Sequence, residues 1–384
     1  MNFELDDEQV MLRDAWRDLL SDRAPIADMR ARLDADEDVD SELWRLAGEL
    51  GWLGVALPEE YEGADQGLVE LALLAEEAGR ALIRGPFLPN AIVGRAITTA
   101  GSPPLRALVL PAIAAGSSWA TWAFAEPHAP WTLDGVHTTA RTDGGAIVLD
   151  GIKTAVQDAG GARWLLVTAR HDGTMRSFLV DRDFPGVTVR RQQTLDPTRA
   201  FYEVRLDGVR VSADRGLDDG PADVQRLLDY ASVLRCAEAL GVMARMLELT
   251  VEYAKVRVQF GRPIGTFQAV KHSCAEMAML VHGVRAATYY AAMAEDAGAE
   301  DAARAACAAA SYTSATAGDV AGRALQLHGG IGFTWEHDLH LYLRRAEVDA
   351  VLYGDTTVHR DRLCRLLRQS PHPLERKEFD GDQG

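Results

Sequence analysis

The stretch Arg257-Val258-Gln259-Phe260-Gly261-Arg262-Pro263-Ile264-Gly265-Thr266-Phe267-Gln268-Ala269-Val270-Lys271-His272 separates two long helical patterns. Before it, apolar residues recur every three or four positions between Leu227 and Ala254, which predicts a helix of roughly eight turns. Glycine and proline inside the stretch break this pattern. A second periodic run extends from Gln268 to about Ala297. The sequence therefore predicts two long helices joined by a short junction.

The junction carries a cationic side chain beside an aromatic one. Arg257 offers a planar fork of donors suited to phosphate, and Phe260 offers a face on which a ring can stack. These residue types favour the binding of an anionic, aromatic ligand. An arginine at the end of a helix can also serve only solvent and the helix dipole, and the residue types alone leave both interpretations open.

Two separate motifs in the chain are shared with a known family. The first is Arg-x-x-Phe-Gly-x-x-Ile-x-x-Phe-Gln, from Arg257 to Gln268. The second is Leu325-Gln326-Leu327-His328-Gly329-Gly330-Ile331-Gly332-Phe333. Together, and in this order, they resemble the acyl-CoA dehydrogenase family. The resemblance covers nearly the whole chain, because the layout described next is also that of the family.

The pattern of the chain changes near Ser117 and again near Pro221. Residues 1–116 read as helical, with helices expected at Glu8–Leu20, after an N-cap at Ser41, and at Leu68–Arg80 with Glu76 and Glu77 on its polar side. Residues 117–217 alternate short β-rich runs with Asp-Gly turns, which predicts a β-barrel or sandwich. Residues 218–384 return to helical patterns, although the charged end from Pro371 is expected to fray. The fold class is therefore α+β, with an N-terminal α-helical domain, a middle β domain and a C-terminal four-helix bundle.

Composition limits the range of functions. Of 384 residues, 47% are hydrophobic, as in a globular protein. The formal charge of −17 argues against nucleic acid or an anionic membrane as a partner. The first residues lack the apolar core of a secretion signal, and no run approaches the ~18 apolar residues of a membrane span. Four well-separated cysteines without metal spacing fit a reducing compartment, so we expect a cytoplasmic protein without a bound metal: Cys236, Cys274, Cys307 and Cys364.

The resemblance implies FAD as cofactor and an acyl-CoA as substrate. Enzymes of the family remove the α proton of the acyl group with a carboxylate while hydride leaves the β carbon for the flavin. By resemblance, Arg257 meets the FAD pyrophosphate, and the other FAD-binding candidates are Phe260, Phe267, Gln268, Gln326, His328, Gly329, Gly330 and Thr356. In this family the groups of the two motifs reach the flavin of a neighbouring subunit. An ordinary helix stop is the alternative for the paired glycines.

The chain departs from the family at the residues for its own flavin. The family carries Thr-Glu-Pro-x-Ala-Gly-Ser where this sequence has Ala125-Glu126-Pro127-His128-Ala129-Pro130-Trp131. Ala125 has no hydroxyl for the flavin, Trp131 replaces the serine, and Pro130 removes a backbone donor. In the next motif, the tryptophan that shields the flavin is Ala155 and the threonine is Gln157.

The catalytic base is the second departure. Most members carry a glutamate in Tyr-Glu-Gly-Thr, where this chain has Tyr353-Gly354-Asp355-Thr356. A minority carry it on the helix before Arg257, at the position of Ala231. Two carboxylates could substitute for it. Glu238 follows Ala231 by two helical turns at nearly the same azimuth, and Asp355 adjoins the usual position. Either could instead be an ordinary solvated or paired carboxylate, so the catalytic residue stays unknown.

We therefore expect an acyl-CoA dehydrogenase-like subunit that works with a homologous chain, or as a homo-oligomer. The paired dehydrogenases of actinobacterial steroid and fatty-acid side-chain catabolism are similar. A catalytically silent structural subunit is one alternative, and non-redox chemistry on an acyl thioester is another.

Overall fold

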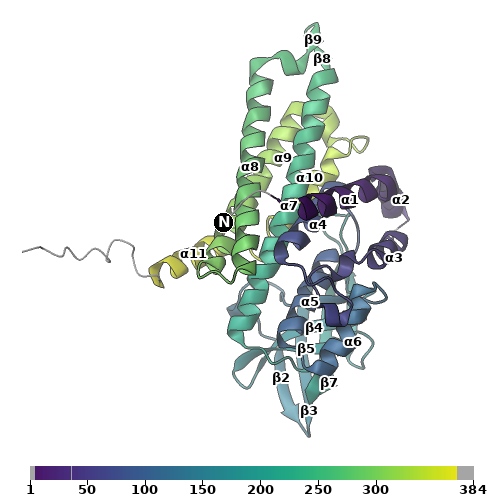
Figure 1. Cartoon of the computed structure of the whole chain (residues 1–384), viewed down its shortest axis with the longest axis vertical. Helices are drawn as coiled ribbons and strands as arrows, with labels where there is room; N and C mark the ends of the chain where they lie inside the picture. The colour runs from purple at the N-terminus through teal and green to yellow at the C-terminus, as the bar shows by residue number, and fades with distance from the viewer. Residues whose placement is uncertain (1–4, 36, 370–384) are drawn as a thin grey trace, which may run out of the picture.

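A computed structural model describes residues 5–35 and 37–369 (Figure 1). The predicted order of a helical domain, a β domain and a second helical domain is confirmed. The end of the chain from Pro371, where fraying was expected, lies outside the described residues. The N-terminal helices are α1 (Asp7–Arg23), α2 (Ile26–Asp34), α3 (Ser41–Glu49), α4 (Leu68–Ala81), α5 (Phe87–Ala100) and α6 (Pro103–Ala114), with 3₁₀ turns at Trp52–Gly54 and Glu59–Tyr61.

Two local expectations in this domain are wrong. The N-cap of α3 is Asp40 and not Ser41, because the Asp40 carboxylate accepts the Leu43 amide at 3.0 Å. Glu76 and Glu77 are buried at 1% and 2% exposure and do not lie on a solvated face. Their charges are compensated from other helices, with Glu76 bound to Arg285 of α8 and Glu77 bound to Arg17 of α1. These partners are distant in sequence, so local periodicity did not indicate the burial.

The middle domain is a mixed seven-stranded sheet in the order β1-β4-β2-β3-β7-β6, with β5 paired to β4. Most neighbours are antiparallel, while β1 and β2 each run parallel to β4. The two longest strands, β3 and β7, pair antiparallel to each other, and their pairing contains bulges after Leu149 and Lys153. The strands are β1 (Ala120–Ala123), β2 (Thr139–Asp143), β3 (Ala146–Gln157), β4 (Trp164–His171), β5 (Thr174–Asp181), β6 (Val187–Gln192) and β7 (Phe201–Ser212), with 3₁₀ turns at Leu133–Gly135 and Ala213–Arg215.

The C-terminal domain is dominated by three long helices that extend away from the sheet (Figure 1). The first of them is longer than the predicted eight turns, since it begins at Pro221 and ends at Val256. Within the described part of the chain, no helix is long and apolar enough to cross a membrane. The elements are α7 (Pro221–Val256), β8 (Val258–Gln259), β9 (Arg262–Pro263), α8 (Gln268–Asp296), α9 (Ala302–His328), α10 (Leu339–Asp349) and α11 (Thr356–Gln369), with 3₁₀ turns at Ile264–Thr266 and Gly329–Phe333.

Helix α4 crosses α7 at backbone contact, and two glycines make this possible. A Cβ atom at Gly79 would lie 2.0 Å from the Glu238 carbonyl oxygen, and one at Gly241 would lie 1.8 Å from the Glu76 carbonyl oxygen. Only glycine permits such an approach. The N-terminal domain is thereby fixed against the middle of α7, and one continuous apolar core runs through both helical domains. This crossing places Glu238 deep inside the molecule.

Candidate active site

The first motif forms the hairpin that joins α7 to α8 at one end of the molecule (Figure 1). Arg257 ends α7 in an extended conformation, and its exposed side chain has no partner among the described residues. Phe260 is 92% exposed in a left-handed conformation, and its ring meets the Phe267 edge with centroids 6.1 Å apart. Arg262 lies over the Phe267 ring at 4.3 Å. The hairpin thus presents aromatic and cationic groups outward.

The second motif ends α9 beside the last turns of α7. His328 stacks on Tyr253 with ring centroids 4.5 Å apart, and Tyr253 lies one turn before Arg257. The imidazole is buried, its Nε2 has no partner, and burial lowers its pKa below the usual value. Gly329 ends the helix with φ of 63°, and a Cβ atom at Gly329 or Gly330 would meet nothing within 4 Å. The structure therefore brings both motifs to one end of the bundle, with open space over the glycines and with Gln268 and Gln326 exposed.

The remaining candidates lie apart from this end, where α7, α11 and the β domain meet. A cavity of about 190 Å³ there is lined by residues that include Trp131, Leu228, Asp229, Tyr353, His359 and Arg362. Gly354, next to Tyr353, is buried with φ of 117°, and Ala231 is buried one turn after Leu228. Thr356 begins α11 beside them. Thr356 is therefore not part of the arrangement formed by Arg257 and the other FAD-binding candidates.

Glu238 is buried in an ionic network. Arg199 donates to one carboxylate oxygen, and Arg345 donates to the other at 2.8 Å. Arg345 also pairs with Asp196 at 2.7 Å, and Arg199 pairs with Asp349 at 2.8 Å. Burial raises the pKa of Asp349 to about 7. A carboxylate that holds two guanidinium groups is strongly disfavoured as a proton acceptor.

Asp355 has a different local role. Its exposed carboxylate accepts the Val358 amide at 2.9 Å and so caps the N-terminus of α11. Sequence reasoning missed the network that holds Glu238, because its members come from the β6–β7 connection, α7 and α10. One feature of the sequence could have indicated it: the charged residues Arg235 and Glu238 lie among apolar residues on the buried face of α7.

In the region where this chain would hold its own flavin edge, aromatic side chains of the chain pack on one another beside the 190 Å³ cavity. Trp131 stacks on Phe124 at 5.9 Å and 12°, and it meets the Tyr353 ring at 5.2 Å. Gln157 accepts a hydrogen bond from Arg199 at 3.3 Å. Ala155 has φ of 49° and no shielding ring. The residues at the α7–α8 hairpin therefore fit the phosphate and ring of FAD, whereas those at the chain's own edge do not.

The loop that carries Trp131 is anchored by a buried ion pair. Lys153 is fully buried and donates to Glu126 at 2.8 Å and to the Phe124 carbonyl at 3.0 Å. Glu126 also accepts the amides of His137 and Thr138 at 2.9 Å and 2.8 Å. Burial lowers the pKa of Lys153 to about 8. The Glu126 carboxylate is thus fully hydrogen-bonded within the loop and is not available for proton abstraction.

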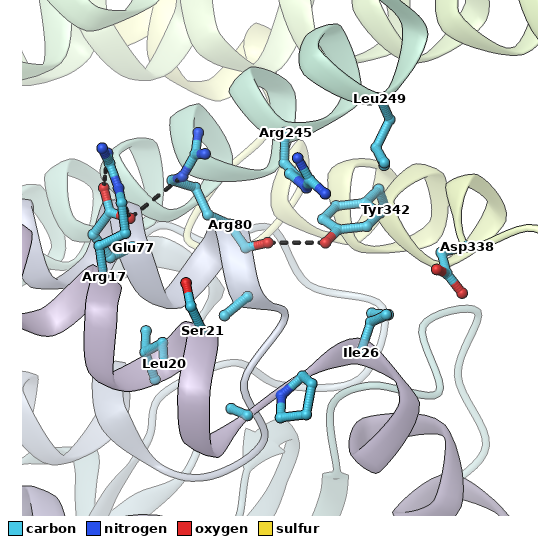
Figure 2. A pocket seen from close by; sticks show the side chains of 13 residues that line it. Arg17, Leu20, Ser21, Ile26, Glu77, Arg80, Arg245, Leu249, Asp338 and Tyr342 are labelled. Atoms are coloured by element: carbon cyan, nitrogen blue, oxygen red, sulfur yellow. Dashed lines mark hydrogen bonds and ion pairs between the residues drawn. The ribbon is translucent and has the colours of Figure 1, made fainter. Parts of the chain in front are cut away.

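A larger cavity of about 340 Å³ lies between the α1–α2 turn, α4, α7 and α10 (Figure 2). Its arginines are ion-paired: Arg17 with Glu77, Arg80 with Glu77 and Glu248, and Arg245 with Glu248. Tyr342 donates to the Arg80 carbonyl at 2.9 Å. Each of these arginines therefore already has a carboxylate partner. Among the residues that the structure describes, no three histidine, cysteine or acidic side chains gather as metal ligands.

Comparison with known proteins agrees with this architecture. Residues 6–117, 121–209 and 218–367 match the N-terminal, middle and C-terminal domains of acyl-CoA dehydrogenase. The chain belongs to the acyl-CoA dehydrogenase family, whose members are FAD-dependent oxidoreductases.

Individual relatives fall in the same family. The chain is 33% identical to acyl-CoA dehydrogenase IpdE2 of Mycobacterium tuberculosis, over 90% of this chain and 93% of the relative. It superimposes on a variant of the Tcur3481-Tcur3483 steroid ACAD with a TM-score of 0.87 and 34% identity, over 94% of this chain and 98% of that chain. It also superimposes on the ChsE4-ChsE5 complex of M. tuberculosis with a TM-score of 0.90 and 27% identity, over 97% and 100% of the two chains.

Proposed function

We propose that this chain is one subunit of a hetero-oligomeric acyl-CoA dehydrogenase, in which a homologous chain supplies the base and the flavin-edge loop. The observation that carries the proposal is the absence of an available carboxylate at both family base positions. Ala231 and Gly354 occupy those positions, Glu238 is held by two arginines, and Asp355 caps a helix. Two of the solved relatives are named as pairs of chains, which is in keeping with this assignment.

In this assembly the chain binds and orients the partner's cofactor. FAD, when bound, accepts the hydride from the β carbon of the acyl group. Arg257 would pair with its pyrophosphate through two charge-assisted hydrogen bonds, and Phe260 would cover a ring of the cofactor. Gln326, Gly329 and Gly330 would line its adenosine end, since the glycines leave room for close backbone approach.

Purification of this chain alone, and together with a homologous chain that carries the glutamate, tests the proposal. The chain alone should be nearly colourless and the pair should be yellow, with sedimentation showing one species that contains both chains. A chain that sediments as a monomer with or without candidate partners would contradict the proposal. So would a chain that by itself retains one FAD per polypeptide.

Two other functions remain as alternatives with distinct outcomes. A silent structural subunit would leave the flavin content and turnover of the pair unchanged when Arg257 is replaced. Non-redox chemistry on an acyl thioester would change the acyl group without bleaching a flavin. The hairpin faces outward, and its Arg257 has no partner among the described residues. This favours the hetero-oligomeric dehydrogenase over both alternatives.

A further inference from the structure

A cavity of about 640 Å³ lies between α2, the α4–α5 connection, the β6–β7 connection and the segment before α10. None of the described residues that line it lines the 190 Å³ cavity or belongs to the two FAD motifs. Its wall carries three arginines, Arg84, Arg191 and Arg199, and two carboxylates, Asp34 and Asp196. A cavity of this size can hold a small organic ligand, so the charges on its wall indicate which class of ligand fits.

Arg84 lines this cavity and is buried with 5% exposure, yet it is weakly paired. Among the described residues, its hydrogen bonds go to Asp38, from Nε to the carbonyl at 3.5 Å and from Nη2 to the carboxylate at 3.3 Å. Both are longer than a usual charge-assisted hydrogen bond. The Asp38 carboxylate also pairs with Arg191 at 2.7 Å and accepts the Tyr202 hydroxyl. The Nη1 of Arg84 is buried without a partner, so this guanidinium keeps a free donor.

Arg199 supplies a second free donor from another element. It is also 5% exposed, and its Nη2 is bound to two buried carboxylates. Its Nε has no hydrogen-bond partner, because the nearest carboxylate oxygen, on Asp196, is 3.9 Å away. The two oxygens of Asp196 are already taken by Arg345 and by Thr198. The other carboxylate of the wall, Asp34, is exposed, so the buried part of the wall offers unpaired donors and a compensated acid.

We propose that this cavity binds a phosphate group, with Arg84 and Arg199 as its donors. Guanidinium N–H groups only donate hydrogen bonds, so the ligand group that pairs with them must be an acceptor. Two arginines on separate elements suit the several oxygens of a tetrahedral phosphate. Exposed Trp335 and partly buried Leu33 line the same cavity and would contact an apolar or aromatic body. The wall therefore favours a phosphate ester, such as a nucleotide, over the free ion, and this inference does not rest on the proposed function.

The test is calorimetric titration of the assembly that the full-length chain forms, saturated with FAD, with AMP as probe and adenosine as uncharged control at constant ionic strength. AMP should bind and adenosine should not. Arg84→Met removes the charge and keeps an unbranched side chain, so it should weaken AMP binding by roughly tenfold or more. Arg141→Met on β2 is the matched control, because Arg141 is exposed and distant in sequence from the cavity wall, and it should bind AMP as the unmodified protein does.

Two exposed residues of the wall keep the test decisive if Arg84→Met fails to fold. Asp34→Asn removes a negative charge from the wall and should tighten AMP binding by roughly twofold. Trp335→Ala should weaken the binding of AMP but not of inorganic phosphate, and this separates an ester from the free ion, which would bind as tightly as AMP if it were the ligand. Equal binding of AMP and adenosine by the unmodified protein would overturn the proposal. Unchanged AMP binding by Arg84→Met, or by both Asp34→Asn and Trp335→Ala, would overturn it as well.

Discussion

At the scale of single residues, substitution of Arg257 gives the most specific prediction, a loss of FAD affinity. Each charge-assisted hydrogen bond to the pyrophosphate is of order 1.5–3 kcal/mol. Arg257→Ala should therefore lower the FAD affinity of the assembly by roughly tenfold or more. Arg257→Lys should restore only part of it, because an ammonium group cannot span two oxygens. Flavin retention after dialysis measures this, and full retention by the alanine variant would show that Arg257 is only a charge at a helix end.

Asp158 predicts a pH dependence of stability. It is buried, and burial raises its pKa to about 7 from the usual value of 3.8. The folded chain therefore keeps a proton that the unfolded chain releases between about pH 4 and pH 7, so this carboxyl lowers stability as the pH rises through that window. Asp158→Asn cannot titrate, and asparagine tolerates the left-handed backbone here.

The free energy of unfolding should accordingly fall less with pH in Asp158→Asn, by up to about 4 kcal/mol across the window. Asp172→Asn is the matched control, because Asp172 is exposed and has the same left-handed conformation. Urea unfolding at pH 4.5 and pH 7.5 measures the difference. Parallel pH profiles for the unmodified protein and Asp158→Asn would contradict the assignment of the buried proton.

At the scale of elements, His359 of α11 packs closely against Gly354 in the connection between α10 and α11. A Cβ atom at Gly354 would lie 2.9 Å from His359 Nε2 and 3.3 Å from Val358 Cγ1, in a conformation that favours glycine. Gly354→Ala should cost about 1–3 kcal/mol for the backbone, and more for the contact. Gly85→Ala has a comparable φ of 131° and a Cβ atom there would make only ordinary contacts at 3.4 Å or more, so it measures the backbone cost alone.

Urea unfolding of both variants, and of Gly354→Ala combined with His359→Ala, separates the two costs. The combined variant should recover the part of the destabilisation that Gly85→Ala does not share. Equal costs at Gly354 and Gly85 would show that His359 does not fill the position of the base. The same contact predicts that Gly354→Glu alone does not rebuild a working base in this chain.

The elements were largely predictable from the sequence, but their polar interior was not. The alternation of short β-rich runs with Asp-Gly turns identified the β domain, and the periodic run from Gln268 matches α8 closely. The burial of Glu76 and of Glu238 was missed, because each carboxylate is compensated by arginines on elements far away in the sequence. Periodicity reports which face of a helix is apolar, but it does not report which charges find a partner inside.

At the scale of the whole molecule, two groups of family residues lie at separate places. The residues that would contact a neighbour's cofactor gather at the α7–α8 hairpin and the end of α9, and they remain open. The positions for the chain's own flavin edge and base lie where α7, α10 and α11 meet the sheet, beside packed aromatic rings and buried ion pairs. This separation is in keeping with the proposal that the chain serves a partner's cofactor.

The most direct test of this account is anaerobic flavin bleaching on addition of a series of acyl-CoA thioesters. The chain alone, mixed with FAD, should not bleach the flavin, because removal of the α proton needs a positioned carboxylate that contributes about 10²–10⁴-fold. The pair with a homologous chain that carries the glutamate should bleach, and it should still do so with Glu238→Gln and Asp355→Asn in this chain. Bleaching by the isolated chain that is abolished by Glu238→Gln or by Asp355→Asn would contradict the account, since the base would then belong to this chain.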